Sequence, residues 1–571
     1  MRRRLRRRRR LPTLLLALAL GCGAGVQRFP LGEAMWVDEG DTRAVRPRPG
    51  ESSANLLQDF VDYTLLRPIT RVFAVDPAGE AIDVNAFDEV PDSSWFENRW
   101  REGGFDVARA LRGACDEPPP VAPWTVVSGK RAGANPGFVI EDAEGRRFVV
   151  KLDEPSQPEH ATSADVIGAT VYWAAGYHTP CNRIAFFQPD ALEIAEGAMA
   201  GKGAEQEPLT RALLQEIVAL GHARADGAVR AMASRYLPGE PLGPWRYEGM
   251  REDDPNDVVP HEDRRELRGS YVVASWIDHW DTRSSNTLRM WIDPDGDGRG
   301  HVRHNFLDWG DVIGTDAGPL GIPPRRGHTY NFHPGHVFTD FVTLGAMPRP
   351  WRHVERGPAG ELLGYFDAER FDPEEWYPSV LNPAFQRATE RDMAWGARRV
   401  AAMGPAFVAA LVASLQLADP GAAAELERVL LARREKILKR WFRRLSPLTE
   451  PRLEAGAGGS GTARLCLRDL AVATGIVEWD ARPYWTRAWR VEGERRVEAL
   501  EPFPLRRRAP DRVCALLPET DAGYLIVDLT GQYGEGDRAA RPARVHLARA
   551  EGGGLQIVGL ERPYELTPPG R

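Results

Sequence analysis

Alternation of apolar and polar residues predicts a β-rich block in the first half of the chain. Residues 124–127, 137–140 and 147–152 have the pattern of strands, and a turn at 142–145 joins the last two as a hairpin. A glycine-bearing loop, 128–137, separates the first two. We expect this block to form the β-rich part of its domain.

Apolar residues recur at helical spacing in later segments. They predict helices over 161–175, with Gly176 as the C-cap, and over 262–278. Residues 380–445 are predicted to be helical, ending in a long helix over 421–444 whose last turns are basic.

The remaining patterns are shorter. Residues 186–228 are predicted to be an irregular insertion with one helix near 209–220, followed by a strand at 231–237. Strands at 288–292 and 303–306 flank the turn 293–298, and short strands recur from 463 to the end of the chain. The mixture of strand and helical patterns predicts an α+β protein.

The N-terminus has the pattern of a targeting segment. Eight Arg within residues 1–10 precede a short apolar run and the sequence Ala19–Cys22, which resembles a bacterial lipobox. We therefore expect residues 1–22 to be a signal peptide and Cys22 to be lipidated, so that the lipid alone anchors the chain to a membrane. The alternative is an ordinary cleaved signal in which Cys22 is incidental.

Charge narrows the range of partners. The chain has 74 basic and 81 acidic residues and a net charge of −7, which becomes −15 without the eight Arg of residues 1–10. An acidic body argues against a general nucleic-acid binder, because phosphate backbones are bound mainly by Lys and Arg.

Export would leave four cysteines in an oxidising compartment. Cys115, Cys181, Cys466 and Cys514 can pair in three ways, and Cys466 with Cys514 is favoured because both lie in the C-terminal region. The alternative is four buried thiols, and the spacings fit no zinc site.

Three local signals carry candidate chemistry, and they occur in a definite order. Lys151 lies in a strand after the glycine-bearing loop, His279–Asn286 (HWDTRSSN) follows a helix, and Asp308-Trp-Gly follows a strand pair. This order, and the offset of five between Asp281 and Asn286, are typical of kinase-like phosphotransferases. Each signal alone has a simpler interpretation, as an exposed edge lysine, a capping loop or a common turn.

The residue types suit phosphoryl transfer. Asn286 and Asp308 offer hard oxygen ligands for Mg²⁺, while Asp281 can accept the proton of an attacking hydroxyl. Arg283 can neutralise charge on the transferred group. Lys151 would hold the ATP phosphates. The remaining expected contributors are Asp165 as the partner of Lys151, with Glu159 as second choice, and Lys130 and Gly133 in the loop over the phosphates.

Several segments resemble the protein-kinase-like superfamily, in its divergent branch of phosphatidylinositol-kinase-like and HipA-type kinases. The chain is most similar to uncharacterised exported bacterial lipoproteins that share VNAFDEVPDSSWF, GFVIEDAEGRRFVVKLD, SADVIGATVYWAAGYHTP, ASWIDHWDTRSSN and HNFLDWGDVIG. The resemblance spans about residues 84–445. It implies a two-lobed α+β fold, with a β-rich N-lobe, a helical C-lobe and a small C-terminal β-domain.

The expected organisation follows from these segments. It comprises a signal peptide (1–22), a tether and lead-in (23–83), a lead-in plus N-lobe (84–245), a helical C-lobe (246–450), a linker (451–462) and a β-domain (463–571).

Two other patterns are weaker indications of a metal site. The segment 293–298 begins like a Ca²⁺ loop, but His304 occupies its twelfth position, so we favour a hairpin turn. Five histidines between 301 and 336 fit no standard metal spacing.

The sequence supports three hypotheses. The first is an exported lipoprotein that transfers phosphate from ATP to a protein, lipid or small-molecule hydroxyl. The second is a kinase-like scaffold that binds a ligand or partner at the cell envelope without turnover. The third, a purely structural envelope lipoprotein, requires the order of the motifs to be a coincidence.

Overall fold

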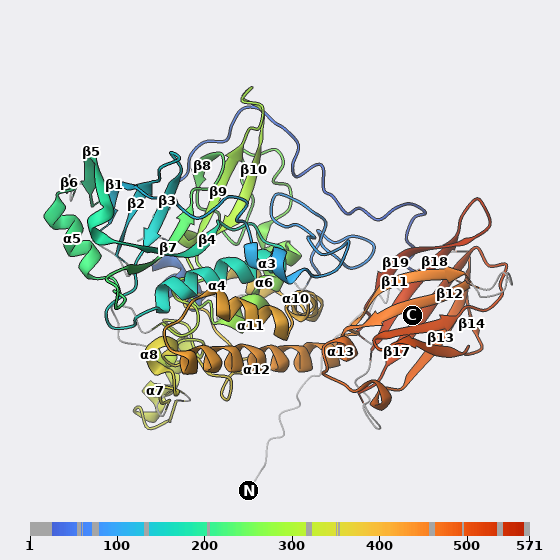
Figure 1. The fold of residues 1–571 in the computed structure, drawn as a ribbon. Helices are drawn as coiled ribbons and strands as arrows, with labels where there is room; N and C mark the ends of the chain where they lie inside the picture. Colours follow the sequence, from blue (N-terminus) through green and yellow to red (C-terminus); the bar gives the residue numbers. More distant parts are fainter. Residues whose placement is uncertain are drawn as a thin grey trace, which may run out of the picture.

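The computed structural model describes residues 26–53, 59, 61–70, 79–130, 136–201, 206–315, 323–349, 351, 354–455, 463–493, 496–533 and 541–564. The expected signal segment with Cys22, and Gly133 of the glycine-bearing loop, lie outside these residues. The described chain is a mixed α+β protein, as expected (Figure 1).

A seven-stranded sheet forms one end of the molecule, with the order β4-β7-β3-β2-β1-β5-β6 (Figure 1). The predicted strands and hairpin are present. Helix α5 packs on one face of the sheet, with Leu213 and Ile217 among the sheet side chains, while α4 contacts β4 and β7. The bounds are β1 (Trp124–Lys130), β2 (Gly137–Glu141), β3 (Arg147–Lys151), β4 (Asn182–Phe187), β5 (Leu192–Ala200), β6 (Glu207–Pro208), β7 (Val229–Arg235), α4 (His160–Ala175) and α5 (Arg211–Ala219).

The expected irregular structure of the insertion at 186–228 is wrong, because β5 and the short β6 lie within it, whereas its predicted helix near 209–220 is present as α5. Strand β5 runs parallel to β1, and the register shifts where β1 is bulged between Val126 and Ser128. The strand is rich in Ala, Glu and Gly, residues with low β propensity, so its local pattern does not indicate a strand. Pairing with β1, about 70 residues earlier in the chain, decides its structure.

A three-stranded sheet, β10-β9-β8, follows in the chain. Its strands are β8 (Glu240–Gly243), β9 (Thr287–Ile292) and β10 (His301–Phe306). Asp293 Oδ2 accepts a hydrogen bond of 2.8 Å from the Gly298 amide, which closes the turn between β9 and β10. The favoured interpretation of this segment as a hairpin turn is confirmed.

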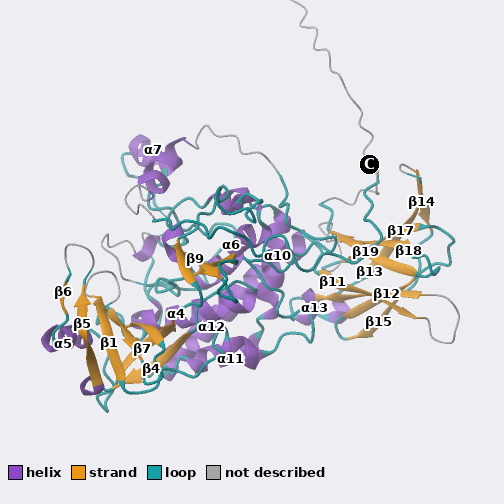
Figure 2. Ribbon diagram, turned by 90° about the horizontal axis from the view of Figure 1, so that it is seen from above, coloured by secondary structure: helices purple, strands orange, loops and turns teal. Residues whose placement is uncertain are grey.

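Helices fill the middle of the molecule (Figure 2). The long α12 runs beneath them toward the C-terminal strands in Figure 1, and Trp276 Nε1 of α6 donates to the Leu430 carbonyl of α12 at 2.8 Å. The helices are α3 (Val107–Arg112), α6 (Arg265–Ile277), α7 (Pro334–Thr343), α8 (Gly360–Leu363), α9 (Pro383–Arg387), α10 (Glu390–Ala402), α11 (Pro405–Ser414) and α12 (Pro420–Arg444). Among described residues no single helix is long and apolar enough to cross a membrane; the bent pair α10 and α11 reaches that length and composition only together.

Two sheets pack face to face at the C-terminal end, around an apolar core that includes Leu467, Val513, Val527 and Val545. Their orders are β11-β12-β16-β15 and β14-β13-β17-β18-β19. The bounds are β11 (Leu448–Ala455), β12 (Ala463–Asp469), α13 (Leu470–Ala473), β13 (Tyr484–Glu492), β14 (Arg496–Leu500), β15 (Leu505–Ala509), β16 (Arg512–Leu516), β17 (Tyr524–Gly531), β18 (Pro542–Arg549) and β19 (Leu555–Glu561).

The expected linker at 451–462 is wrong in its first part. Residues 451–455 belong to β11, which pairs antiparallel with β12, so this β-domain begins before the glycine-rich run rather than after it. Glycine-rich composition indicates a turn or a linker equally well, and only the pairing of the flanking strands distinguishes them.

Two disulfides are present, Cys115–Cys181 and Cys466–Cys514. Cys466 and Cys514 are opposite each other on the paired strands β12 and β16. The favoured C-terminal pairing is confirmed.

Residues 26–53 are not the free tether that their polar composition predicts. Val26 is buried in an apolar cluster of the C-terminal β-domain, and Val45 in another with Leu242 and Trp291. Figure 1 shows this segment passing over the molecule from the β-domain to the sheet of β8–β10. A few well-spaced apolar residues are enough to anchor a polar segment when each meets a complementary surface.

Candidate functional site

Lys151, at the end of β3, contacts two carboxylates. Its Nζ lies 2.9 Å from Asp165 Oδ2 on α4 and 2.7 Å from Asp308 Oδ1, just after β10. The Lys151 side chain is 16% exposed and that of Asp165 is 1% exposed, while that of Asp308 remains 54% exposed. The structure thus brings together three of the predicted site residues. The second-choice partner, Glu159, instead accepts a hydrogen bond from the Ala418 amide at 3.0 Å.

Lys151, Asp165 and Asp308 change one another's pKa values. Burial alone would lower the pKa of Lys151, but the carboxylates of Asp165 and Asp308 outweigh burial and raise it. Lys151 lowers the pKa of Asp308 against the opposing effect of burial, and Lys130 at the end of β1 adds to this lowering. Burial raises the pKa of Asp165 despite its contact with Lys151. A charged lysine therefore faces an ionised, accessible Asp308.

Helix α4 also holds the segment Asp308–Gly310 in place. Asp165 Oδ1 accepts a hydrogen bond of 3.0 Å from the Trp309 amide, so one carboxylate orients both Lys151 and the backbone that carries Asp308. The Trp309 side chain is fully buried. Asp308 itself has a positive φ of 58°, a conformation uncommon for residues other than glycine.

Asp281 lies in the loop that follows α6. Its Oδ2 accepts hydrogen bonds from Arg283 Nη2 at 2.6 Å and from Asn286 Nδ2 at 3.0 Å. Asn286 Nδ2 also donates to the Asp281 carbonyl at 2.8 Å, which closes the loop. The structure thus assembles the predicted residues Asp281, Arg283 and Asn286 into one hydrogen-bonded unit.

Asp311 is a largely buried member of the site that no sequence motif indicates, with a side chain 15% exposed. Its Oδ2 accepts a hydrogen bond of 2.7 Å from the Asp281 amide, and its Oδ1 lies 3.9 Å from Nε2 of the buried His279. Burial, followed by the charge of Asp281, raises the pKa of Asp311 well above its usual range. In the sequence, Asp311 is distinguished only as an acidic residue three positions after Asp308.

A cavity of about 340 Å³ adjoins the Asp281 loop and Asp308. The amide of Asn286 and the carboxylate of Asp308 both line it, and these hard oxygen donors fit Mg²⁺. Residues 282–285 of the HWDTRSSN segment also line it. The sequence did not indicate the rest of its wall, because the residues come from distant segments: Asp59, Tyr63, Tyr247, Val380, Leu381, Asn382 and Pro383.

Of the five histidines between 301 and 336, three stack on other aromatic rings. The His304 ring stacks on Trp95 with a centroid distance of 3.4 Å, and His333 stacks on His336 at 4.1 Å. Within the described residues, only Glu454, Cys466 and Cys514 gather closely enough to suggest a metal site, and the two cysteines are joined as a disulfide.

Two predicted site residues, Gly133 and Cys22, lie outside the described part of the chain. No family model, curated protein or solved structure matches this sequence.

Proposed function

We propose that this chain is an exported phosphotransferase with a two-lobed, protein-kinase-like fold, which uses ATP and Mg²⁺ to phosphorylate a hydroxyl acceptor. The contact of Lys151 with both Asp165 and Asp308 carries the proposal. Protein kinases require a strand lysine paired with a helix acid, and an aspartate that holds the metal. The seven-stranded sheet with α4 would be one lobe, and the helices from α6 to α12 the other.

The polar residues of the site that the sequence predicted have the following roles in this proposal. Lys151 binds the nucleotide phosphates and Asp165 orients it, while Lys130 lies near enough to Asp308 to influence its pKa. Asn286 and Asp308 would hold Mg²⁺, which neutralises phosphate charge when bound. Asp281 accepts the proton of the acceptor hydroxyl, and Arg283 supplies positive charge beside it.

The cavity beside Asp308 is the proposed acceptor site. Tyr63, Tyr247 and Leu381 give it an apolar wall, while Ser284 and Ser285 offer hydroxyls. This mixture suits an organic molecule or side chain that presents one hydroxyl group. The acceptor class remains a protein, lipid or small-molecule hydroxyl.

One observation favours a second candidate, a kinase-like scaffold that binds a ligand without turnover. Both Arg283 and Asn286 donate to the same oxygen of Asp281, so that oxygen is already engaged within the loop. An oxygen engaged in this way is less available to an acceptor hydroxyl, while nucleotide binding does not depend on it.

We also propose that the protein works in an oxidising compartment, anchored through Cys22. Its two disulfides support this location, because such bonds persist in exported proteins and are rare in the cytosol. Detection of these four cysteines as free thiols in the native cell would contradict the proposal.

The test measures thermal stabilisation by Mg²⁺-ATP and phosphate transfer in parallel. Ligand at about 100 times its dissociation constant should stabilise the wild-type protein by about 2.7 kcal/mol. Asp308→Asn should lose the magnesium-dependent part of this shift, whereas Asp281→Asn should keep the shift but lose transfer to an envelope fraction. Asp480→Asn is the matched control, because its side chain is 98% exposed and lies in the β-domain.

The outcomes separate the two candidates. A shift without transfer in the wild-type protein would identify the scaffold. The absence of any shift in the wild-type protein would rule out both nucleotide-dependent functions.

A further inference from the structure

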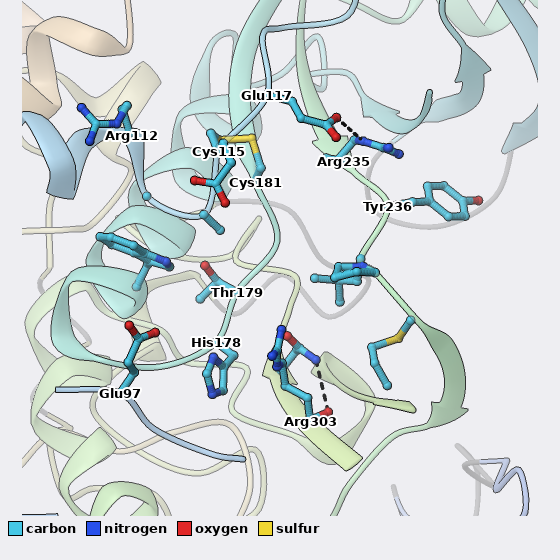
Figure 3. Close-up of a pocket in the computed structure, with 18 of the residues that line it drawn as sticks. Glu97, Arg112, Cys115, Glu117, His178, Thr179, Cys181, Arg235, Tyr236 and Arg303 are labelled. Atoms are coloured by element: carbon cyan, nitrogen blue, oxygen red, sulfur yellow. Dashed lines mark hydrogen bonds and ion pairs between the residues drawn. A yellow bond between two sulfur atoms is a disulfide. The ribbon is translucent and has the colours of Figure 1, made fainter. Parts of the chain in front are cut away.

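A second cavity, of about 600 Å³, shares no lining residue with the cavity beside Asp308. Figure 3 shows the residues around it. Its wall comes from residues 97–99, α3 and the loop after it, Phe148 of β3, the end of α4 and its connection to β4, the end of β7 and the segment after it, and strands β9 and β10. The Cys115–Cys181 disulfide holds two of these segments together in the wall. The volume is in the range of small-molecule sites.

The wall carries more positive than negative charge, although the whole chain is acidic. Five arginines line the cavity against three acidic residues, and the arginines are Arg99, Arg109, Arg112, Arg235 and Arg303. Two of the five have carboxylate partners: Arg99 pairs with Glu97 at 3.1 Å and Arg235 with Glu117 at 3.0 Å. Among the described residues, no carboxylate forms an ion pair with the other three.

Arg303, on β10, is the central residue. No described side chain forms an ion pair with its guanidinium; burial lowers its pKa, and only the charge of Glu97 opposes this effect. Glu97 is already paired with Arg99, so a single carboxylate provides the negative charge that acts on both guanidinium groups. Arg99 is 6% exposed, and its Nε has no hydrogen-bond partner.

The pKa of His178 also indicates an excess of positive charge around the cavity. Its pKa is well below the usual range because the ring is buried, and because Arg99 and Arg303 lie close enough to repel a second positive charge. Figure 3 shows His178 and Arg303 together on one side of the cavity, with Arg112 and Arg235 on the other walls. Guanidinium groups held near one another in a partly buried space are stabilised by a shared anion, which they bind through paired N–H···O bonds.

We propose that this cavity binds a small organic oxyanion, either a phosphate monoester or a carboxylate. Arg303 and Arg112 supply the donors for the acidic oxygens. Trp173, Phe148 and Met290 form an apolar wall for the organic part.

The test is calorimetric titration of the whole protein with glycerol 2-phosphate and, separately, with citrate, at constant ionic strength in chloride. At least one of the two should bind saturably. Its dissociation constant should rise at least tenfold in Arg303→Gln and in Arg112→Gln. It should change less than twofold in Arg506→Gln, an exposed arginine of β15 in the C-terminal domain.

A Lys151→Met variant separates this site from the proposed nucleotide site and should bind the oxyanion as the wild type does. Tighter binding of glycerol 2-phosphate identifies the ligand class as phosphate esters, and tighter binding of citrate identifies it as carboxylates. Three results would overturn the proposal: no binding of either probe, an equal loss in Arg506→Gln, or a loss in Lys151→Met with both cavity variants unchanged. Arg112 is exposed at the end of α3, so its variant remains informative if Arg303→Gln does not fold.

Discussion

At the scale of single residues, His160 shows how burial sets a protonation state. It is 2% exposed, its Nδ1 lies 2.7 Å from the Leu362 carbonyl, and its Nε2 has no hydrogen-bond partner. Because a carbonyl only accepts hydrogen bonds, Nδ1 carries the proton of the neutral ring. Burial lowers the pKa of His160 to about 4, although the Leu362 carbonyl opposes this shift.

The pH dependence of stability follows from this pKa. Between about pH 6.5, the ordinary value for the unfolded chain, and pH 4, only the unfolded state takes up the proton, so acid destabilises the fold by about 3 kcal/mol through this residue. His160→Asn keeps a donor for the Leu362 carbonyl and removes the titration. In urea denaturation, the free energy of unfolding of the wild type relative to the variant should fall by that amount from pH 7 to pH 4. A pH-independent difference would show that His160 has the same pKa in both states.

At the scale of elements, the packing of α4 against residues 308–310 depends on Gly168. A Cβ at this position would lie 2.0 Å from Cγ of the buried Trp309, and Asp165, one turn earlier on α4, bonds the amide of Trp309. Gly168→Ala should therefore push α4 away from Asp308. The expected cost of overpacking is about 1–3 kcal/mol, more than the gain of about 1 kcal/mol that Ala brings to a helix interior.

The measurement is the free energy of unfolding in urea, together with the stabilisation by Mg²⁺-ATP, which should also decrease. Gly357→Ala is the matched control, because no atom lies within 4 Å of its Cβ position and its φ lies outside the left-handed region. The control should change stability by less than about 0.5 kcal/mol. Equal stability of the Gly168 variant and the wild type would show that Trp309 can move without cost.

At the scale of the whole molecule, one aspartate links the C-terminal β-domain to the helices. Asp88 Oδ2 lies 2.7 Å from Nη1 of the buried Arg562, just after β19, and Asp88 also pairs with Arg265 of α6 and Arg398 of α10. Burial alone would raise the pKa of Asp88, but the three guanidinium groups outweigh burial and lower it well below its usual range.

Asp88→Asn should leave these arginines buried without their shared counter-charge, at a cost of about 3–5 kcal/mol. Asn tolerates the φ of 59° at this position, so the effect is one of charge rather than backbone strain. In calorimetry we expect the β-domain to unfold in a separate, earlier transition. Asp297→Asn removes an exposed ion pair with Arg46 and should have little effect. A single unshifted transition for Asp88→Asn would contradict this role.

The sequence by itself determined the local elements and the order of the candidate chemistry. Strand alternation located β1 to β3, helical periodicity located α4, α6 and α12, and the choice of Asp165 as the partner of Lys151 agrees with the contact in the structure. These features could be predicted from the sequence because each depends on residues that are close together in the chain, or on a motif whose spacing is set by one turn.

Only the tertiary structure decided the features that depend on distant segments. Strand β5 exists because β1 pairs with it, two separate apolar clusters anchor residues 26–53, and Asp311 joins the site through the amide of Asp281. The arginine-lined cavity is assembled from separate stretches of the chain between residues 97 and 305. The physical reason is common to all four: burial and unpaired charge arise from long-range contacts, which no local pattern of residues records.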